Sequence, residues 1–147
     1  MAEISSERRA LLEGVAGEFL HEYPRGARLL AVAGADAGRA ADFARDLASV
    51  LAERGLATSS VAQDGRGEHE LRAEVAAPVR AERADAVTIV SGDGSLLADR
   101  TRGLWHSSVC VVAGDEEANT LASAIVDATD PDRPIRRLAD YCQCDIE

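Results

Sequence analysis

Apolar residues recur every three or four positions in two stretches of the chain, which is the spacing of a helix with one buried face. The first stretch predicts a helix over residues 5–22, with a serine at its start as the N-cap. The second predicts a helix that buries apolar side chains within residues 43–51 and ends at Gly55. A third, strongly charged helix is expected over residues 68–83, where Pro78 has to kink it or end it.

Between these helices lie short runs of apolar and β-branched residues. Residues 29–33, 86–90 and 109–112 are the most apolar, as in strands that are buried on both faces of a parallel sheet. Residues 57–61 form a weaker, more polar strand, and residues 123–127 supply a fifth. Strands that alternate with helices predict an α/β fold, a three-layer, doubly wound parallel sheet of about five strands with flanking helices.

The chain of 147 residues is expected to form a single domain, because this length is sufficient to bury one core. Residues 1–26 would be its N-terminal helix and connector, and residues 135–147 a C-terminal tail.

Charge and composition narrow the classes of function. A formal net charge of −10 argues against nucleic acid and anionic membranes as partners. No apolar run approaches the roughly 18 residues that span a bilayer, and the N-terminus lacks a signal-peptide pattern, so a cytoplasmic protein is expected. Three cysteines are too few for a disulfide framework. Cys110 is expected in the core, whereas for Cys142 and Cys144 a metal or disulfide role and an incidental role remain open.

The turn between the apolar run 29–33 and the next helix carries the most chemical information. Strand, glycine turn and helix form the layout of a phosphate-binding loop, in which backbone N–H groups face an anion. In the working motif G-x-x-x-x-G-K-[ST] the lysine neutralises phosphates and the hydroxyl holds magnesium. Counted from Gly34, these two positions are Ala40 and Ala41, and the place of the second glycine is Arg39.

The candidate phosphate-binding residues are therefore Gly34, Asp36, Gly38 and Arg39, with Arg39 as the nearby cation. Asp42 in the first helical turn would repel a triphosphate. Three interpretations follow. The turn no longer supports phosphoryl transfer, which we favour; it is a weakened nucleotide site; or it is an ordinary α/β turn.

Several segments carry a resemblance when they are taken in order. Residues 32–44 (VAGADAGRAADFA) match without a gap a pattern of apolar strand, Gly-x-Asp-Gly-x-Gly-Lys-Thr-Thr and Phe-Ala. With residues 84–108 and 123–134, they make the chain similar to the uridine kinase-like P-loop nucleoside kinases over most of its length. The resemblance implies a P-loop NTPase-like fold. It also implies that Asp64 corresponds to the acid that takes the proton from the substrate hydroxyl.

The departures from that family remove its chemistry. The Walker lysine position is Ala40, and the second acidic position is Ser91, with Asp93 displaced by two residues. Residues 119–122 occupy the place of an arginine-bearing lid and are too few to form one. A scaffold that has stopped being a kinase explains these losses together.

The first functional hypothesis is a non-catalytic pseudokinase, a regulator, scaffold or accessory protein that binds a protein partner or a second copy and needs no cofactor or metal. The second is a weak nucleotide-binding protein or a divergent ATP-dependent small-molecule kinase, which would use ATP, magnesium, Arg39 and Asp64. The third is a small-molecule enzyme in the crevice at the strand ends, with Asp64 and Asp93 as its acid and base. It requires a pocket that joins the two carboxylates and a raised pKa for one of them.

Overall fold

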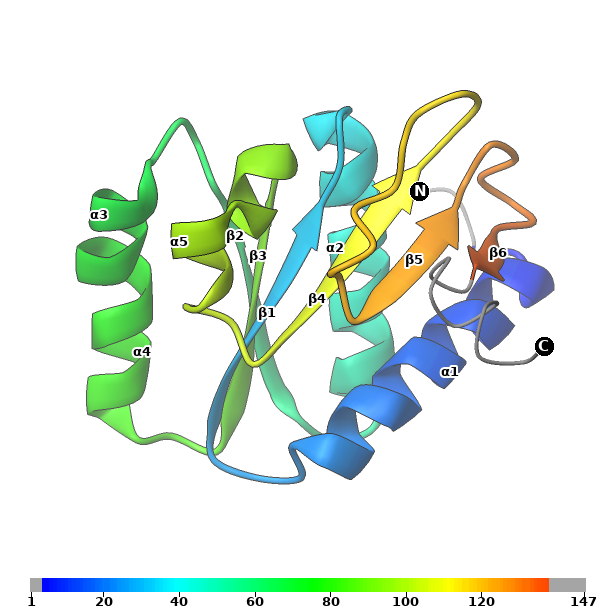
Figure 1. Cartoon of the computed structure of the whole chain (residues 1–147). Helices are drawn as coiled ribbons and strands as arrows, with labels where there is room; N and C mark the ends of the chain where they lie inside the picture. The colour runs from blue at the N-terminus through cyan, green and yellow to red at the C-terminus, as the bar shows by residue number, and fades with distance from the viewer. Residues whose placement is uncertain (1–3, 138–147) are drawn as a thin grey trace, which may run out of the picture.

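The computed structural model describes residues 4–137 and shows a six-stranded sheet with helices on both faces (Figure 1). The strands are β1 (Ala27–Ala33), β2 (Ala57–Ala62), β3 (Ala86–Gly92), β4 (Ser107–Val112), β5 (Ala124–Asp127) and β6 (Ile135–Arg137). The helical elements are α1 (Ser6–Glu22), α2 (Ala37–Glu53), α3 (Glu68–Leu71), the π-helical segment η1 (Arg72–Ala76), α4 (Ala77–Glu82), the 3₁₀ turn η2 (Gly94–Leu97) and α5 (Asp99–Arg102). The strand order is β2-β3-β1-β4-β5-β6, and all neighbours are parallel except β5 and β6. The predicted α/β class with flanking helices is confirmed.

The sheet has one strand more than the sequence pattern predicts. Residues 135–147 are assigned to a tail by their sequence, but Ile135–Arg137 pair with β5 as the antiparallel edge strand β6. A strand of three residues, two of them arginines, is too short and too polar for periodicity to reveal. The prediction made for Cys142 and Cys144 lies outside the described residues.

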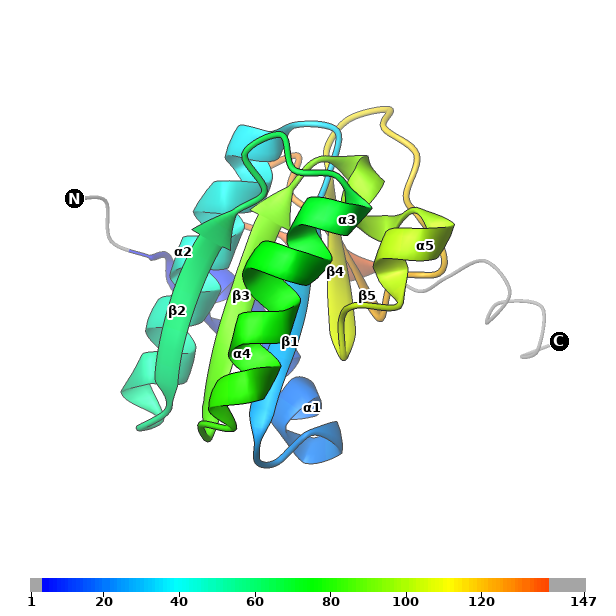
Figure 2. The same cartoon turned by 90° about the vertical axis from the view of Figure 1, so that its left-hand side faces the viewer.

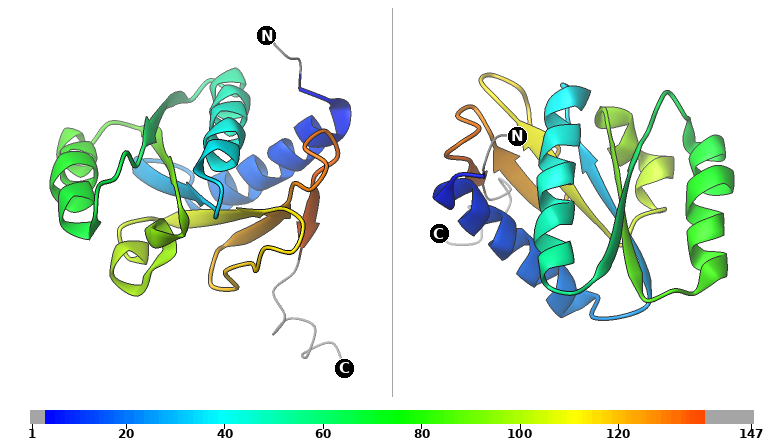
Figure 3. Two further views of the ribbon diagram at one scale, coloured as in Figure 1. Left: turned by 90° about the horizontal axis from the view of Figure 1, so that it is seen from above. Right: turned by 180° about the vertical axis from the view of Figure 1, so that it is seen from behind.

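One apolar cluster on each face of the sheet holds the three layers together (Figure 3). Leu30 and Val32 of β1 pack against α1 and α2, whereas Leu29 belongs to the opposite cluster. That second cluster includes Trp105, whose Nε1 donates a hydrogen bond of 2.9 Å to the carbonyl of Leu96. Burial on both faces explains why the central strands are uninterrupted apolar runs.

Helix α1 begins at the predicted cap, because the Ser5 hydroxyl accepts a hydrogen bond of 3.1 Å from the backbone N–H of Arg8. The guanidinium of Arg8 then joins three parts of the fold. It donates to the carboxylate of Asp46 at 2.8 Å and to the carbonyl of Pro131 at 2.9 Å, and it lies 5.6 Å from the ring centre of Phe43. Helix α1 is thereby held against α2 and against the loop after β5.

The other predicted helices are confirmed, and the one that contains Pro78 is interrupted by η1. Helix α2 is followed by Gly55, whose φ of 87° ends it as expected. The charged helix continues through Pro78, because η1 immediately before it loosens the helical turn in which the proline ring would meet a carbonyl. It ends at Arg83, which has a φ of 54°. Within residues 4–137, no helix is long and apolar enough for a membrane crossing.

Strands β1 and β3 lie side by side but send the chain to opposite faces of the sheet. Helix α2 follows β1 on one face, and η2 and α5 follow β3 on the other (Figure 2). In open α/β sheets, ligands bind outside the carboxyl ends of strands at such a point. Here the N–H of Gly34 donates to the carbonyl of Gly92 at 3.2 Å, so a main-chain hydrogen bond joins the two strand ends.

Gly34 lies too close to β4 to carry a side chain. A Cβ atom at this position would lie 2.4 Å from the carbonyl oxygen of Val111. The φ angles of Gly34 and Gly38 are not positive, so the turn does not use the backbone freedom that glycine provides. Gly34 is required by packing between neighbouring strands.

Gly34→Ala is expected to lower the free energy of unfolding by about 1–3 kcal/mol, the usual cost of forcing a methyl group into a filled site. Urea denaturation followed by circular dichroism measures it. Gly14→Ala is the control, because open space surrounds that glycine within α1 and alanine there favours the helix. An unchanged midpoint for Gly34→Ala would show that β4 moves aside at little cost.

At the opposite end of the sheet, a buried arginine holds the chain before β1. The residue Arg28 is only 1% exposed. Its guanidinium donates to the carbonyls of Tyr23 and Gly26, at 2.9 and 3.0 Å, and to the carboxylate of Asp85 at 3.0 Å. The bonds satisfy a charge that would otherwise be costly to bury.

His106 lies beside this network and is held in its neutral form. Its ring packs edge-on against Tyr23, and its Nδ1 accepts a hydrogen bond of 3.0 Å from the N–H of Leu29. Burial, together with the positive charges of Arg80 and Arg28, lowers the pKa of His106 below its ordinary value of 6.5. The unfolded chain therefore takes up a proton at a higher pH than the folded protein.

The free energy of unfolding is expected to fall as the pH decreases below about 6.5, because protons then bind more readily to the unfolded chain. His106→Gln should reduce this pH dependence, since glutamine does not titrate. His69→Gln, at an exposed position on α3, should leave it as in the unmodified chain. Urea unfolding at a series of pH values tests this, and equal slopes for all three proteins would contradict a role for His106.

Candidate functional site

The turn between β1 and α2 is short, and its helix N-terminus is already occupied by the chain's own carboxylate. Only residues 34–36 separate Ala33, the last residue of β1, from Ala37, the first of α2. Asp36 is the N-cap, and its side chain accepts a hydrogen bond of 3.1 Å from the N–H of Arg39. A carboxylate thus takes the position at which a phosphate-binding helix would hold its anion.

The two alanines at the expected lysine and hydroxyl positions differ in their surroundings. Ala40, at the place of the lysine, is fully buried in the cluster beneath α1 and α2. Its Cβ faces the core, so a lysine there would have no path to a phosphate at the turn. Ala41, at the place of the hydroxyl, is half-buried.

Arg39 is paired with acidic side chains. Its Nη1 lies 2.8 Å from Oε1 of Glu116, and its Nη2 lies 3.6 Å from Oδ2 of Asp36. The same Glu116 oxygen accepts a hydrogen bond of 3.2 Å from the N–H of Ala113. Arg39 therefore joins the start of α2 to the loop after β4. Its positive charge, which a phosphate at the turn would need, is already neutralised by Glu116 and Asp36.

A hollow of about 550 Å³ lies beside this pair, between the start of α2 and the ends of β4 and β5. Asp36 and Asp42 line it together with Arg39, and Thr129 closes its other side. Two carboxylates and one arginine leave the lining with a net negative charge. This sign opposes the approach of a polyphosphate.

The connection from β4 to β5, residues 113–123, contains no helix and no arginine. It includes residues 119–122, where the resemblance places a lid. Its Leu121 side chain is 61% exposed. In the structure this loop supplies Glu116 to Arg39 and supplies no cation to the turn.

Asp64 lies in the exposed turn that follows β2, next to Gly65. Its φ of 52° is a left-handed conformation that aspartate tolerates better than most residues. The N–H of Arg66 donates to the carbonyl of Gln63 at 3.1 Å and closes the turn. The position of Asp64 is therefore explained by turn formation.

Asp93 directly follows β3 and binds the chain that comes after it. Its Oδ1 accepts hydrogen bonds from the N–H and the hydroxyl of Ser95, at 2.9 and 2.5 Å. These bonds lower the pKa of Asp93 below its ordinary value. A general acid needs a raised pKa, so the shift is opposite to the one that the acid–base hypothesis requires.

Gln63 is the residue at this edge that sequence analysis does not single out. Its Oε1 accepts a hydrogen bond from the N–H of Asp93 at 3.1 Å, and its Nε2 donates to Ser95 at 2.8 Å and to the carbonyl of Arg66 at 3.0 Å. A Cβ on Gly92 would lie 2.2 Å from Gln63 Oε1, so Gly92 makes room for this amide. A glycine that ends a strand is the only sequence signal of the contact.

Asp127 and Thr129 form the same kind of turn after β5. The N–H and hydroxyl of Thr129 donate to Asp127 Oδ1 at 3.0 and 2.6 Å, and the hydroxyl bond is the main cause that lowers the pKa of Asp127. Asp127 and Thr129 lie in segment 123–134, which carries part of the family resemblance, and local hydrogen bonding explains both residues. Within residues 4–137, no three histidine, cysteine, aspartate or glutamate side chains gather as metal ligands would.

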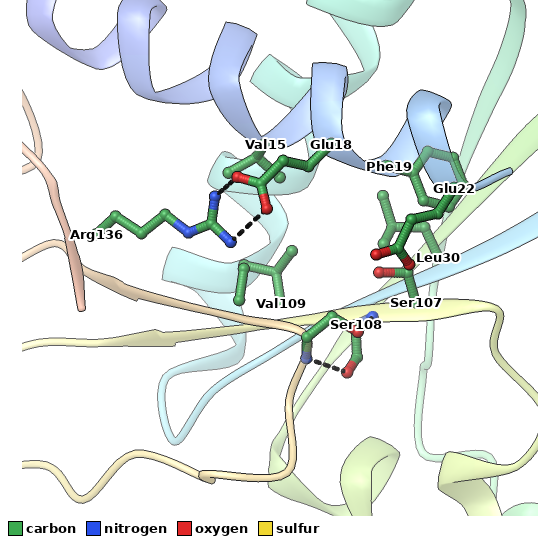
Figure 4. Close-up of a pocket in the computed structure, with 11 residues that line it drawn as sticks. Val15, Glu18, Phe19, Glu22, Leu30, Ser107, Ser108, Val109 and Arg136 are labelled. Carbon is green, nitrogen blue, oxygen red and sulfur yellow. Dashed lines mark hydrogen bonds and ion pairs between the residues drawn. The ribbon is translucent and has the colours of Figure 1, made fainter. Parts of the chain in front are cut away.

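A smaller cavity, of about 50 Å³, lies between α1 and the first residues of β4 and β5 (Figure 4). Ser108 and Ser123 exchange hydrogen bonds there, each backbone N–H donating to the other hydroxyl at 3.1 and 3.2 Å. The ion pair of Glu18 with Arg136 lies across the cavity, with 3.0 Å between Oε1 and Nη2. The volume suits one or two water molecules.

The predicted residues all lie at the carboxyl ends of the parallel strands, but they belong to separate local hydrogen-bond networks. Gly34, Asp36, Gly38 and Arg39 share the turn after β1, whereas Asp64 and Asp93 follow β2 and β3. Cys110 is buried in β4, as expected. Comparisons of the chain with protein-family models, with curated proteins and with solved structures found no match.

Proposed function

We propose that this protein is a non-catalytic relative of the uridine kinase-like P-loop nucleoside kinases that acts through protein contacts, as a regulator, scaffold or accessory subunit. The observation that carries the proposal is the pairing of Arg39 with Glu116 beside Asp36. A triphosphate would have to break this ion pair and approach a helix N-terminus already capped by a carboxylate.

The energies of the contacts at the turn after β1 favour a turn that binds no phosphate. A hydrogen bond to a charged group contributes about 1.5–3 kcal/mol, and freeing Arg39 from Glu116 would cost an amount of the same order. The chain contains no lysine, so an arginine is the only residue type that could replace the Walker lysine. With Ala40 in the core, nothing at the turn compensates for the lost ion pair.

The family assignment rests on the sequence resemblance, and the architecture is compatible with it. The glycine turn follows β1, which lies inside the sheet between β3 and β4, and it leads directly into α2. It also lies at the carboxyl end of a parallel strand, where α/β folds place their ligands. A kinase scaffold whose turn is filled by its own side chains accounts for both the retained matches and the lost chemistry.

One observation favours the second candidate, a weak nucleotide-binding protein or divergent kinase. The hollow of about 550 Å³ beside Arg39 is large enough for a phosphate group, and Thr129 lines it. The third candidate, an acid–base enzyme, has less support, because Asp64 lies on an exposed turn and Asp93 has a lowered pKa.

Titration of the full chain with ATP and Mg²⁺ is expected to give no heat of binding at about 100 µM protein, since the net interaction at the turn is close to zero. Glu116→Gln should allow weak ATP binding, because it frees Arg39 while the amide oxygen still accepts the N–H of Ala113. Binding should disappear again when Arg39→Ala is added.

Arg45→Ala is the matched control, an exposed arginine of the same helix paired with Asp42. Low-micromolar binding of ATP by the unmodified chain, abolished by Arg39→Ala and retained in Arg45→Ala, would overturn the proposal in favour of the second candidate.

A further inference from the structure

Strand β6 is held in the fold by little apolar contact. All three of its residues are exposed, and Ile135 is 65% exposed. Among the described strands its partner is β5, with which it pairs over three residues. Three residues form few main-chain hydrogen bonds, each of which contributes little, and pairing removes conformational freedom from every one of them. The free energy that keeps β6 closed on β5 is therefore small.

Within residues 4–137, one ion pair binds β6 to an element outside the sheet. The guanidinium of Arg136 donates to the carboxylate of Glu18 on α1 through both terminal nitrogens, with 3.0 Å between Nη2 and Oε1. The two side chains meet across the small cavity beneath α1 (Figure 4). The Glu18 side chain is 63% exposed and that of Arg136 33%. An ion pair with this exposure is weakened by salt.

The residues directly before β6 are fixed more firmly. The carbonyl of Pro131 accepts a hydrogen bond of 2.9 Å from the buried Arg8, and the carbonyl of Asp132 accepts one from the Ser5 hydroxyl. Pro134, the last residue before β6, is buried, and its ring restricts the rotation of the main chain. The chain is therefore anchored to α1 and the core up to the residue at which β6 begins.

We propose that β6 is a strap that opens from and closes on the edge of β5, with its anchor at Pro134, and that the Arg136–Glu18 ion pair sets the fraction of molecules in which it is closed. Opening frees the main-chain groups of β5 that pair with β6. It also removes part of the wall of the cavity beneath α1, because Arg136 lines that cavity. Low ionic strength favours the closed strap, and high ionic strength favours the open one.

Opening of the strap is distinct from unfolding of the domain. Strand β1 lies between β3 and β4 and is buried on both faces, so its amide protons exchange with solvent only when the core opens. The amide protons of β6 exchange whenever the strap opens. The strap is also independent of the turn after β1, so the outcome of the ATP titration leaves it untouched.

Amide hydrogen exchange of the full chain, measured by NMR at constant pH, tests the proposal. The amide protons of β6 should be at least about a hundred-fold less protected than those of β1, because opening the strap leaves the core intact. A rise in salt from about 0.02 to 0.5 M should lower the protection of β6 about two- to five-fold, the contribution of one exposed ion pair, and should not lower that of β1.

Glu18→Gln should lower the protection of β6 by the same two- to five-fold and remove most of its response to salt, because the ion pair is already lost. Glu18 is exposed on α1, where glutamine is also a good helix former, so the variant keeps the fold. Glu13→Gln is the matched control, because it removes an ion pair with Arg54 from the same helix and should leave β6 unchanged. Protection of β6 equal to that of β1 overturns the proposal, as does an equal effect of Glu18→Gln and Glu13→Gln.

Discussion

At the carboxyl end of β1, the main chain of Gly34 lies against the carbonyl of Val111 and donates its own N–H to Gly92. This close packing sets the path of the chain that follows. Helix α2 starts at Ala37, and its first turn places Ala40 in the core. A loop that surrounds a phosphate needs backbone N–H groups turned toward an open space. Here the turn packs against β4, and Gly34 permits the close contact with Val111 because it has no Cβ.

The acidic side chains of this edge act on their own backbone. Asp36 caps α2, Asp93 binds Ser95, and Asp127 binds Thr129. Each carboxylate accepts hydrogen bonds within three residues, and for Asp93 and Asp127 these bonds lower the pKa. Carboxylates held ionised in this way stabilise turns and are poor proton donors. The aspartates at the carboxyl ends of the strands are therefore explained by their hydrogen bonds within turns and at a helix start.

The side chains around the turn after β1 bind one another and leave the lateral edges of the sheet uncovered by this network. The Arg39–Glu116 pair ties α2 to the loop after β4, so the edge at which a ligand would bind is fastened by side chains. The lateral edges are unequal, because β6 is short and charged whereas β2 is longer and neutral. The proposed role in protein contacts rests on this pair, which closes the turn after β1.

The sequence pattern was sufficient for most of the fold. Helix α1 with its Ser5 cap, the end of α2 at Gly55, and the strands with continuous apolar runs follow from local spacing and burial, which the chain carries in its own order. Sequence periodicity missed β6, which pairs with β5 only because the preceding loop brings it back. It also expected a kink or an end at Pro78, and a π-helical segment interrupts the α-helix directly before the turn that holds this proline.

For the candidate site too, some features can be read from the sequence and others only from the folded chain. The sequence alone shows that alanines stand at the lysine and hydroxyl positions, because residue identity at a fixed offset is a linear property. Only the folded chain shows that Glu116, 77 residues away, neutralises Arg39, that Gln63 fills the space left by Gly92, and that Gly34 is required by Val111. These contacts join residues distant along the chain, and their distances are decided by how the strands pack, which no local pattern records.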